Sequence, residues 1–541
     1  MRASVDMRRD GHRQKRAWTT AISLVAVCAL GAACDSGSSS GPAASSASDA
    51  ADVNAAAANP IDPGAIDKAV GQIDGMVDEL MRATGTPGMA VAVVHGDKQV
   101  YAKGFGVANM ATGAKVDADT VFQLASVSKS IGSSVVAAEV TKKAITWDTP
   151  VVANLPSFTL SDPWVTTHVT VADMYSHRSG LPEHAGDKLE SIGYSQQDVL
   201  ARMRSVPLSP FRATYDYTNF GLTAAAESVA AKAGKDWATL SADTIYTPLG
   251  MSSTSSRYSD FVSRPDRAVG HIKIDGKWAP TTFQREPDAQ SPAGGVSSSV
   301  DDLSHWLEMM LGDGTYQGRQ IVSPESMTPA ISPEIVSNPP AGPADRAGFY
   351  GYGFNSSVTA DGRTMYSHSG AFSSGAGTNF VVIPSADVAI VTLTNAAPTG
   401  AAESLGMQFA DLVQYGERRT DWFDLYGPAF EEQSKPFGSL VGVTRPAPST
   451  PTQPLASYAG TYTNGYYGPA TVAERGGTLQ LSLGPDGRTT YPLTHWSGNE
   501  FTYSMRDENA EDGSISKVTF DGPSMTIEYY DDEESNGVFT R

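Results

Sequence analysis

Residues 120–129 read TVFQLASVSK, and this stretch decides how the rest of the chain is interpreted. An extended apolar run gives way to a helical pattern at Ser126. Residues three apart on a helix share a face, so the amine of Lys129 can lie against the Ser126 hydroxyl. A hydroxyl needs such a base to act as a nucleophile, and the unpaired N–H groups of a first helical turn can hold an oxyanion. The stretch therefore predicts a serine nucleophile with a lysine partner.

The S-x-x-K spacing is a weak signal by itself, because the chain contains it twice. The second copy, Ser514 to Lys517, lies in a segment that alternates like a strand. Strand residues three apart point to opposite faces, so that copy cannot bring its serine and lysine together. We therefore expect only the copy at Ser126 to be functional.

Two further motifs follow Ser126 in order. Tyr217-Thr218-Asn219 begins 91 residues after Ser126, and His368-Ser369-Gly370 begins 151 residues after Tyr217. Isolated copies of the same patterns occur elsewhere, such as Tyr462-Thr463-Asn464 and His184-Ala185-Gly186. Only the first set combines the order S-x-x-K, Y-x-N, H-x-G with strand–helix, loop and strand contexts.

This ordered set resembles the penicillin-recognising serine hydrolases, and among them the class C β-lactamase-related branch. Other short segments are similar to sequences of that family, including His177-Arg178-Ser179-Gly180 and Pro292-Ala293-Gly294-Gly295. The resemblance spans residues 61–400 or so. It implies an α+β fold, in which helices flank an antiparallel sheet and a mostly helical insert separates the first strands from the last.

The resemblance also implies roles for the first two motifs. Ser126 would form an acyl-enzyme that water later hydrolyses. Either Lys129 or Tyr217 would remove the serine proton, a choice that the sequence leaves open, and Tyr217 would protonate the leaving group. A lysine can accept a proton only if burial and positive neighbours lower its pKa. Asn219 would hydrogen-bond Lys129 or a substrate amide.

The third motif carries the substrate-binding and oxyanion roles. Gly370 would let its strand approach the substrate, and the N–H of Ala371 would be the second oxyanion donor beside that of Ser126. His368 departs from the class C β-lactamases, which carry a lysine there whose charge attracts the substrate carboxylate. A histidine is mostly neutral at neutral pH.

This departure favours a peptidase, carboxypeptidase or esterase acting on an ester or amide of a small molecule or peptide. A β-lactamase is the alternative within the same family. A non-catalytic envelope protein that binds peptidoglycan or a β-lactam is the alternative from another class.

The first residues have the pattern of an export signal. Basic residues precede an uncharged run from Ala17 to Ala33, which predicts a signal peptide over residues 1–33. Leu30-Gly31-Ala32-Ala33-Cys34 resembles a bacterial lipobox, which predicts lipidation of Cys34 and a membrane-anchored lipoprotein of the cell envelope. A secreted or periplasmic protein is the alternative.

Composition excludes several other classes of function. The chain carries a net charge of −20 and no basic stripe, so we expect no nucleic-acid partner. Both cysteines fall at or before position 34, and the histidines lack metal-ligand spacing, so we expect no disulfide, metal or cofactor. No later stretch is apolar enough to span a bilayer, and the oligomeric state cannot be read from the sequence.

Composition shifts divide the remaining chain. Residues 34–60 are rich in Ser, Ala and Gly, which predicts a flexible tether before a catalytic domain over residues 61–433. An amphipathic helix is expected at its start, from Ile66 to Leu80. Residues 434–454 form a Pro/Ser/Thr-rich linker, and residues 455–541 alternate in short runs typical of a small antiparallel barrel. The barrel resembles the lipocalin-like domain of some family members, and a gating or oligomer-forming role for it is left open.

Overall fold

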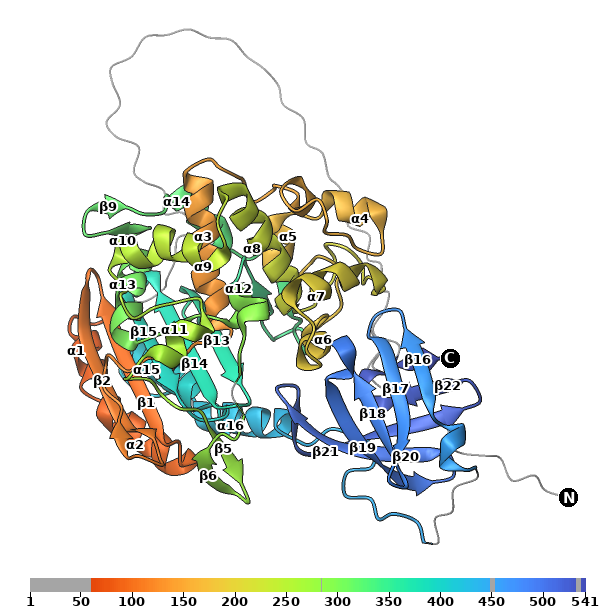
Figure 1. The fold of residues 1–541 in the computed structure, drawn as a ribbon. Helices are drawn as coiled ribbons and strands as arrows, with labels where there is room; N and C mark the ends of the chain where they lie inside the picture. Colours follow the sequence, from red (N-terminus) through yellow and green to blue (C-terminus); the bar gives the residue numbers. More distant parts are fainter. Residues whose placement is uncertain (1–59, 284, 448–452, 532–536) are drawn as a thin grey trace, which may run out of the picture. The chain divides into compact units, whose positions relative to one another are not determined.

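A nine-stranded antiparallel sheet lies at the centre of the larger part of the fold (Figure 1). The computed structural model describes residues 60–283, 285–447, 453–531 and 537–541, which belong to one compact unit. The predicted signal peptide, Cys34 and all of the tether but its last residue lie outside the described residues. In sheet order the strands are β10 (Ile335–Asn338), β11 (Gly348–Tyr350), β12 (Asn355–Val358), β13 (Thr364–Phe372), β14 (Ala376–Ile383), β15 (Val388–Thr394), β1 (Gly88–His95), β2 (Lys98–Asn109) and β3 (Ala114–Lys115).

Strand β1 shows why both faces of this sheet are covered. Successive strand residues point to opposite faces, and nearly all of β1 is buried and apolar. Ala90, Ala92 and Val94 enter one core, whereas Met89 and Val91 enter the other. Helices on both sides therefore sandwich the sheet (Figure 1).

Three helices pack onto the sheet face that carries Met89 and Val91: α1 (Ala65–Val70), α2 (Ile73–Thr84) and α15 (Ala401–Tyr415). The other face is covered by α3 (Val127–Thr141) and α13 (Val300–Leu311). Most of the remaining helices belong to the insert between β3 and β10: α4 (Pro163–His168), α5 (Val171–Tyr175), α6 (Asp187–Ser191), α7 (Gln196–Arg202), α8 (Asn219–Ala233), α9 (Trp237–Ser241), a π-helical turn (Ala242–Tyr246), α10 (Thr247–Leu249), α11 (Tyr258–Ser263), α12 (Ser291–Gly294) and α14 (Pro324–Ile331).

Short paired strands complete the insert: β4 (Phe122–Gln123) with β7 (Ser297–Ser298), β5 (His271–Ile274) with β6 (Lys277–Pro280), and β8 (Thr315–Tyr316) with β9 (Arg319–Gln320). The predicted α+β architecture with a mostly helical insert is confirmed. None of the described helices is both long and apolar enough to cross a bilayer.

The first helix differs from its prediction. The periodicity from Ile66 to Leu80 predicted one helix, but the structure contains two, with Gly71 and Gln72 between them. Gly71 has low helix propensity, and its N–H donates to the carbonyls of Ala69 and Asp67 where α1 ends. The buried positions still follow one apolar face, because both helices pack into the same core.

Residues after Pro454 form the predicted small antiparallel barrel, which is closed and has eight strands. Seven of them correspond to the short runs seen in the sequence, and the eighth, β23, closes the barrel by pairing Thr540 with Thr463. Rings of Tyr458, Phe501 and Phe520 pack against one another inside it, with centroids 4.9–5.7 Å apart. The strands are β16 (Gly460–Asn464), β17 (Gly468–Arg475), β18 (Thr478–Leu483), β19 (Thr489–Ser497), β20 (Glu500–Asp507), β21 (Ala510–Asp521), β22 (Ser524–Ile527) and β23 (Val538–Thr540).

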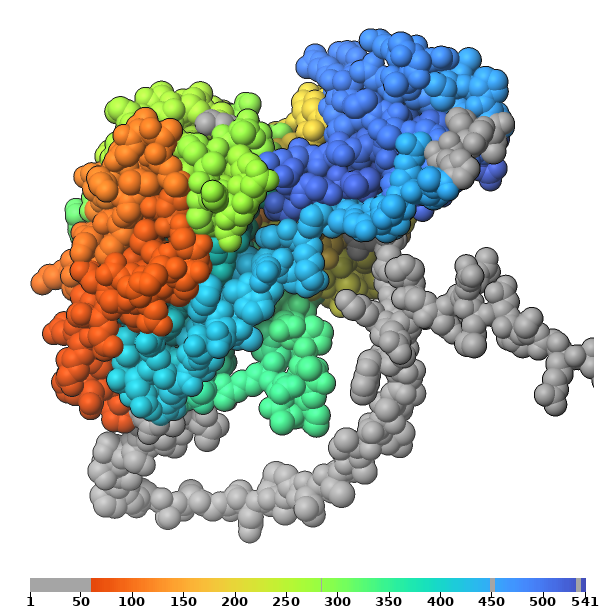
Figure 2. All heavy atoms as spheres, turned by 90° about the horizontal axis from the view of Figure 1, so that it is seen from below, coloured from red at the N-terminus to blue at the C-terminus, as the bar shows by residue number. Residues whose placement is uncertain are grey.

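A helix that the sequence did not indicate, α16 (Trp422–Gln433), precedes the barrel. The segment after it pairs with the barrel, since Ile515 donates its N–H to the Phe437 carbonyl and Phe437 donates to the Ser514 hydroxyl. Figure 2 shows the blue surface of the barrel in contact with the light-blue segment that contains α16. The barrel also packs directly onto the domain that carries Ser126, since the Tyr194 hydroxyl donates to the Tyr467 carbonyl at 3.0 Å.

Candidate active site

Ser126 stands at the start of α3, where a strained turn places it. Ala125 has a positive φ of 46°, which is uncommon for a residue with a Cβ, and α3 begins at Val127. Strand β13 runs close beside this turn. A Cβ on Gly370 would lie 2.2 Å from the Leu124 carbonyl oxygen and 3.0 Å from the Ser126 nitrogen. Only glycine fits at position 370, because this strand lies so close to the turn that carries Ser126.

Lys129 lies one helical turn after Ser126 and is fully buried. Its Nζ is 3.0 Å from the Ser126 Oγ, 2.7 Å from the Asn219 Oδ1 and 2.9 Å from the Ala293 carbonyl oxygen. Burial lowers the pKa of Lys129 to about 7, although the nearby carboxylate of Asp187 opposes this shift. The amine is therefore neutral in a substantial fraction of molecules at neutral pH.

These three contacts suit both protonation states of Lys129. A neutral amine has two N–H donors and one lone pair. The amide oxygen of Asn219 and the carbonyl of Ala293 accept the two N–H groups, which leaves the lone pair for the Ser126 hydroxyl. The ammonium form can donate to all three oxygens. The amine can therefore gain a proton without rearranging its partners.

Tyr217 approaches the same hydroxyl from the loop before α8. Its phenol lies near the Ser126 side chain, and its ring centroid is 4.6 Å from the Lys129 Nζ. Burial raises the pKa of Tyr217 well above its ordinary value, while the Ser126 contact opposes this. The phenol therefore stays protonated at neutral pH.

Asn219 is oriented by Asp187, a residue that no sequence motif indicated. The Asn219 amide nitrogen donates to the Asp187 Oδ2 at 2.9 Å, which turns its oxygen toward Lys129. The same carboxylate oxygen is 2.9 Å from the His184 Nδ1. His184 belongs to an H-x-G that appeared to be a chance copy, so its position at the site was missed.

Hydrogen bonds between two loops hold Tyr217 in place. The backbone carbonyl of Tyr217 accepts the N–H of His184 at 2.8 Å, and Thr218 donates its N–H to the His177 Nδ1 at 3.2 Å. Farther out, Arg212 donates its N–H to the Arg178 carbonyl at 2.8 Å. The backbone of residues 177–184 and 212–218 therefore forms one unit.

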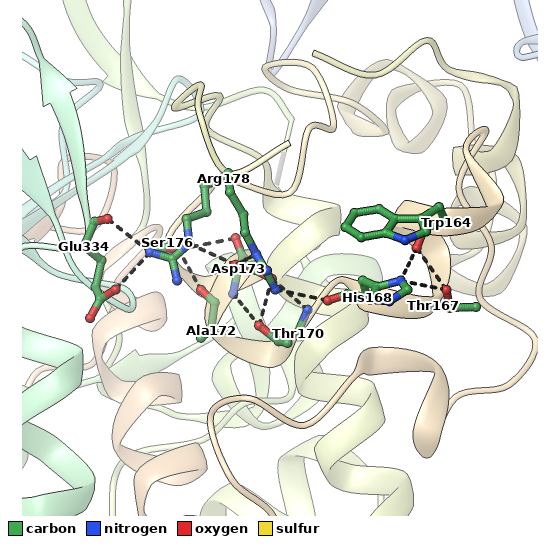
Figure 3. A network of polar contacts seen from close by, with 10 residues as sticks. Trp164, Thr167, His168, Thr170, Ala172, Asp173, Ser176, Arg178 and Glu334 are labelled. Carbon is green, nitrogen blue, oxygen red and sulfur yellow. Dashed lines mark hydrogen bonds and ion pairs between the residues drawn. The ribbon is translucent and has the colours of Figure 1, made fainter. Parts of the chain in front are cut away.

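A buried carboxylate, that of Asp173, anchors both loops. Figure 3 shows Asp173 bonded to Thr170 and Arg178, with Glu334 on the other side of Arg178. Arg212 also donates to Asp173, at 2.8 Å. Burial opposes ionisation of Asp173, but the bonds from Arg212 and Arg178 outweigh it and keep its pKa below the ordinary value. The position of Tyr217 thus depends on charges in the layer behind the site.

His368 lies on β13 and is buried, with both ring nitrogens engaged by the protein. Its Nδ1 is 2.6 Å from the Ser369 carbonyl, which can only accept, so the proton is on Nδ1. Its Nε2 then accepts from the Tyr350 hydroxyl at 2.7 Å. Burial and the neighbouring Lys129 lower the pKa of His368 to about 3. The imidazole is therefore neutral, and Tyr350 is a second partner that the sequence did not single out.

These residues open into one cavity of about 950 Å³. The predicted site residues Ser126, Tyr217, Asn219, His368 and Ala371 line it, while Lys129 lies beneath Ser126 and Gly370 packs against the turn. The wall also contains residues that no motif indicated, from α6, the segment before α12, and the barrel: Asp187, Glu190, Arg285, Glu508 and Tyr529. Within the described ranges no three His, Cys, Asp or Glu side chains are grouped as metal ligands.

Comparison with known families agrees with this geometry. A β-lactamase family model matches residues 73–414, so the chain belongs to the β-lactamase family, a fold family of serine hydrolases. A second model, a domain of unknown function (DUF3471), matches residues 444–534 and covers most of the barrel.

Individual relatives extend over most of the chain. It is 27% identical to the unguisins hydrolase ungD of Aspergillus violaceofuscus over 74% of this chain and 75% of that protein. It is 29% identical to penicillin-binding protein 4 of Amycolatopsis lactamdurans over 71% of this chain and 95% of that protein. The solved octameric penicillin-binding protein homologue from Pyrococcus abyssi superposes with a TM-score of 0.57 at 19% identity, covering 87% of this chain and 100% of that chain, which supports the fold.

Proposed function

We propose that this chain cleaves an ester or amide bond through an acyl-enzyme on Ser126, with Lys129 as the base that activates the serine. The observation that carries this proposal is the environment of the Lys129 amine. It is buried, 3.0 Å from the Ser126 Oγ, and its two other partners are pure hydrogen-bond acceptors. Burial that lowers its pKa to about 7 makes a proton transfer from Ser126 accessible at neutral pH.

The first half-reaction follows from these contacts. Lys129 takes the hydroxyl proton as the Ser126 Oγ forms a bond to the substrate carbonyl carbon. The N–H groups of Ser126 and Ala371 receive the oxyanion, and Gly370 allows the strand that carries Ala371 to come this close. Collapse of the tetrahedral intermediate then breaks the bond to the leaving group and leaves the acyl-enzyme.

Tyr217 is better suited to donate a proton than to remove one. Burial raises the pKa of its phenol, so the group is protonated at rest, and it lies near the Ser126 side chain. It can pass its proton to the departing alcohol or amine and recover one from the Lys129 ammonium. Water then attacks the acyl-enzyme, and the same two groups return the proton to the Ser126 oxygen.

A peptidase or esterase is favoured over a β-lactamase by the state of His368. A buried neutral imidazole, with both nitrogens bonded to Ser369 and Tyr350, offers no fixed charge for a substrate carboxylate. The relatives named as a hydrolase and as a penicillin-binding protein are compatible with acyl transfer to a serine.

We also propose that the protein is exported and held at the membrane by a lipid on Cys34. The lipobox-like sequence before Cys34 supports this assignment. Growth of the producing cells with a clickable palmitate analogue should label the wild-type chain and not a Cys34→Ala variant. Equal labelling of both chains, or labelling of neither, would contradict the anchor.

The catalytic proposal is tested with covalent probes and a substrate panel. A fluorophosphonate should label the wild-type chain at one site and fail to label Ser126→Ala. The panel contains p-nitrophenyl esters, D-amino-acid amides, D-Ala-D-Ala peptides and nitrocefin, and turnover should be greater on an ester or amide than on nitrocefin. A chain that binds fluorescent penicillin reversibly, but is neither acylated nor active on any of these, would instead be a binding protein.

A further inference from the structure

A turn of the barrel forms part of the cavity wall beside the proposed nucleophile. The turn joins β20 to β21, and its residues Glu508 and Asn509 line the cavity together with Ser126. The Asn509 amide donates to the Ser191 hydroxyl at 3.0 Å, on the helix side of the cavity. Lys188, one turn earlier in α6, donates to the Tyr529 carbonyl of the barrel at 2.7 Å. The barrel therefore contributes surface to the site itself.

Glu508 fixes this turn to the strand that carries the oxyanion donor. Its Oε1 accepts the N–H of Ser373 at 2.7 Å, and Ser373 follows Ala371 by two residues. The two partners are 135 residues apart in the chain, so the bond joins the barrel to the β13–β14 turn. One oxygen of the carboxylate is thereby fixed in position.

The other oxygen of Glu508 has no donor among the described residues. Its Oε2 is buried without a hydrogen bond, and so are the Asp187 Oδ1 and the Glu190 Oε1, two further carboxylate oxygens of the cavity wall. Buried polar atoms are costly when they have no partner, so a ligand that supplies N–H donors gains on binding here. Burial raises the pKa of Glu508 to about 7, opposed by the charge of Arg285, and an ammonium close by would favour the ionised form.

The cations of the cavity do not make it a site for anions. The Arg285 guanidinium is 2.5 Å from the Glu190 carboxylate, so its charge is already balanced, although its Nε has no acceptor. Carboxylates outnumber cations on the wall, with Glu183, Asp187, Glu190, Glu508 and Glu511 against Lys188, Arg285, Lys435 and His184. His184 is counted as a cation because Asp187 raises its pKa against the effect of burial. Neutral His368 adds no positive charge.

We propose that the barrel turn determines specificity, with the Glu508 carboxylate binding the ammonium group of an amine-bearing substrate whose carbonyl is presented to Ser126. This inference rests on the proposed acyl transfer and names the substrate class for it. Glu508 acts as a specificity-determining residue, and the barrel acts as one wall of the substrate site.

The test compares substrates that differ only in charge at one end. Alanine p-nitroanilide carries an ammonium, N-acetylalanine p-nitroanilide is neutral, and N-succinylalanine p-nitroanilide carries a carboxylate; each is used in both enantiomers. Full-length wild-type protein should prefer the ammonium substrate over the neutral one, with the anionic substrate last. Glu508→Gln keeps an oxygen that can accept from Ser373 and removes the charge.

We expect Glu508→Gln to lower kcat/KM for the ammonium substrate about tenfold, mainly through KM, as the loss of one charge pair predicts. The neutral substrate should change less than about twofold. Asp512→Asn is the matched control, because Asp512 is an exposed carboxylate on the same hairpin that does not line the cavity. Equal loss on all three substrates would assign Glu508 to holding Ser373 alone and overturn the inference, as would no change on any.

A second measurement does not depend on turnover. Alaninamide and N-acetylalaninamide are compared for their ability to slow fluorophosphonate labelling of Ser126, and only the first should protect, with protection lost in Glu508→Gln. Labelling of Ser126 without any preference for the amine would refute this inference and leave the proposed function standing. Failure of Ser126 to label would refute the proposed function itself.

Discussion

The two S-x-x-K sequences of this chain have the same spacing of serine and lysine, but one lies on a helix and the other on a strand. On helix α3, the Ser126 Oγ and the Lys129 Nζ are 3.0 Å apart. On strand β21, Ser514 is fully buried, and its hydroxyl accepts the N–H of Phe437, whereas the Lys517 Nζ lies 3.9 Å from Glu500. The S-x-x-K spacing therefore brings the serine and lysine side chains together only on a helix, where residues three apart share a face.

Replacing the first serine should break the function completely. Ser126→Ala removes the proposed attacking oxygen, so turnover of any accepted ester or amide should fall by roughly 10⁴-fold or more. The measurement is kcat/KM on the best substrate of the panel, with fluorophosphonate labelling in parallel. Ser514→Ala is the matched control from the second copy and should keep near-wild-type turnover. Loss of labelling in Ser514→Ala with retention in Ser126→Ala would reverse the assignment.

Replacing the lysine of each copy in turn should change turnover by amounts that differ almost as much as for the two serines. Lys129→Ala removes the base and leaves Asn219 and Ala293 without their donor, so we expect a fall in kcat of roughly 10³-fold. Lys517→Ala removes a partly exposed side chain with one weak ion pair and should leave kcat unchanged. Single-turnover acylation rates measure both. A Lys129→Ala enzyme that acylates at the wild-type rate would exclude Lys129 as the base.

The positions of the proposed site residues could be predicted because each lies in a short motif near the start or end of a helix or strand. Ser126 precedes α3, Asn219 begins α8, and Gly370 lies in β13. Their order and local pattern indicated the fold and the first contacts of the site. The family pattern was enough to predict that Lys129 lies against Ser126 and that Tyr217 lies beside Lys129.

The supporting residues could not be predicted, because tertiary contacts alone bring them to the site. Asp187 and Glu508 carry no motif, and Glu508 reaches Ser373 across 135 residues of chain. The break between α1 and α2 was missed, because one apolar stripe continues across Gly71. Strand β23 is only three residues long, too short for an alternating pattern to reveal.

The pH dependence of turnover should show whether Lys129, the lysine of the first copy, acts as the base. Burial lowers the pKa of Lys129 to about 7, so its neutral, proton-accepting form dominates above that pH and is lost below it. The kcat/KM of a substrate without ionisable groups should therefore fall about tenfold per pH unit on the acid side of 7.

Asp187→Asn is the variant that tests this assignment. The Asp187 carboxylate raises the pKa of Lys129 against the effect of burial, so its removal should move the acid limb of the profile to lower pH. Asp198→Asn changes an exposed carboxylate of the neighbouring helix α7 and should leave the limb in place. A limb that does not move in Asp187→Asn would show that another group controls it.

The smallest effect is expected for the stability role of the second copy. The Ser514 hydroxyl receives the Phe437 N–H at 2.9 Å and so ties the segment after α16 to the barrel. Ser514→Ala leaves that N–H without its acceptor, which should lower the free energy of unfolding by about 1–2 kcal/mol. Urea denaturation followed by circular dichroism measures the change. Thr461→Ala is the control, because this exposed barrel residue should alter stability by less than about 0.5 kcal/mol. If both substitutions lower the free energy of unfolding by the same amount, Ser514 has no structural role, and its contrast with the proposed catalytic role of Ser126 is lost.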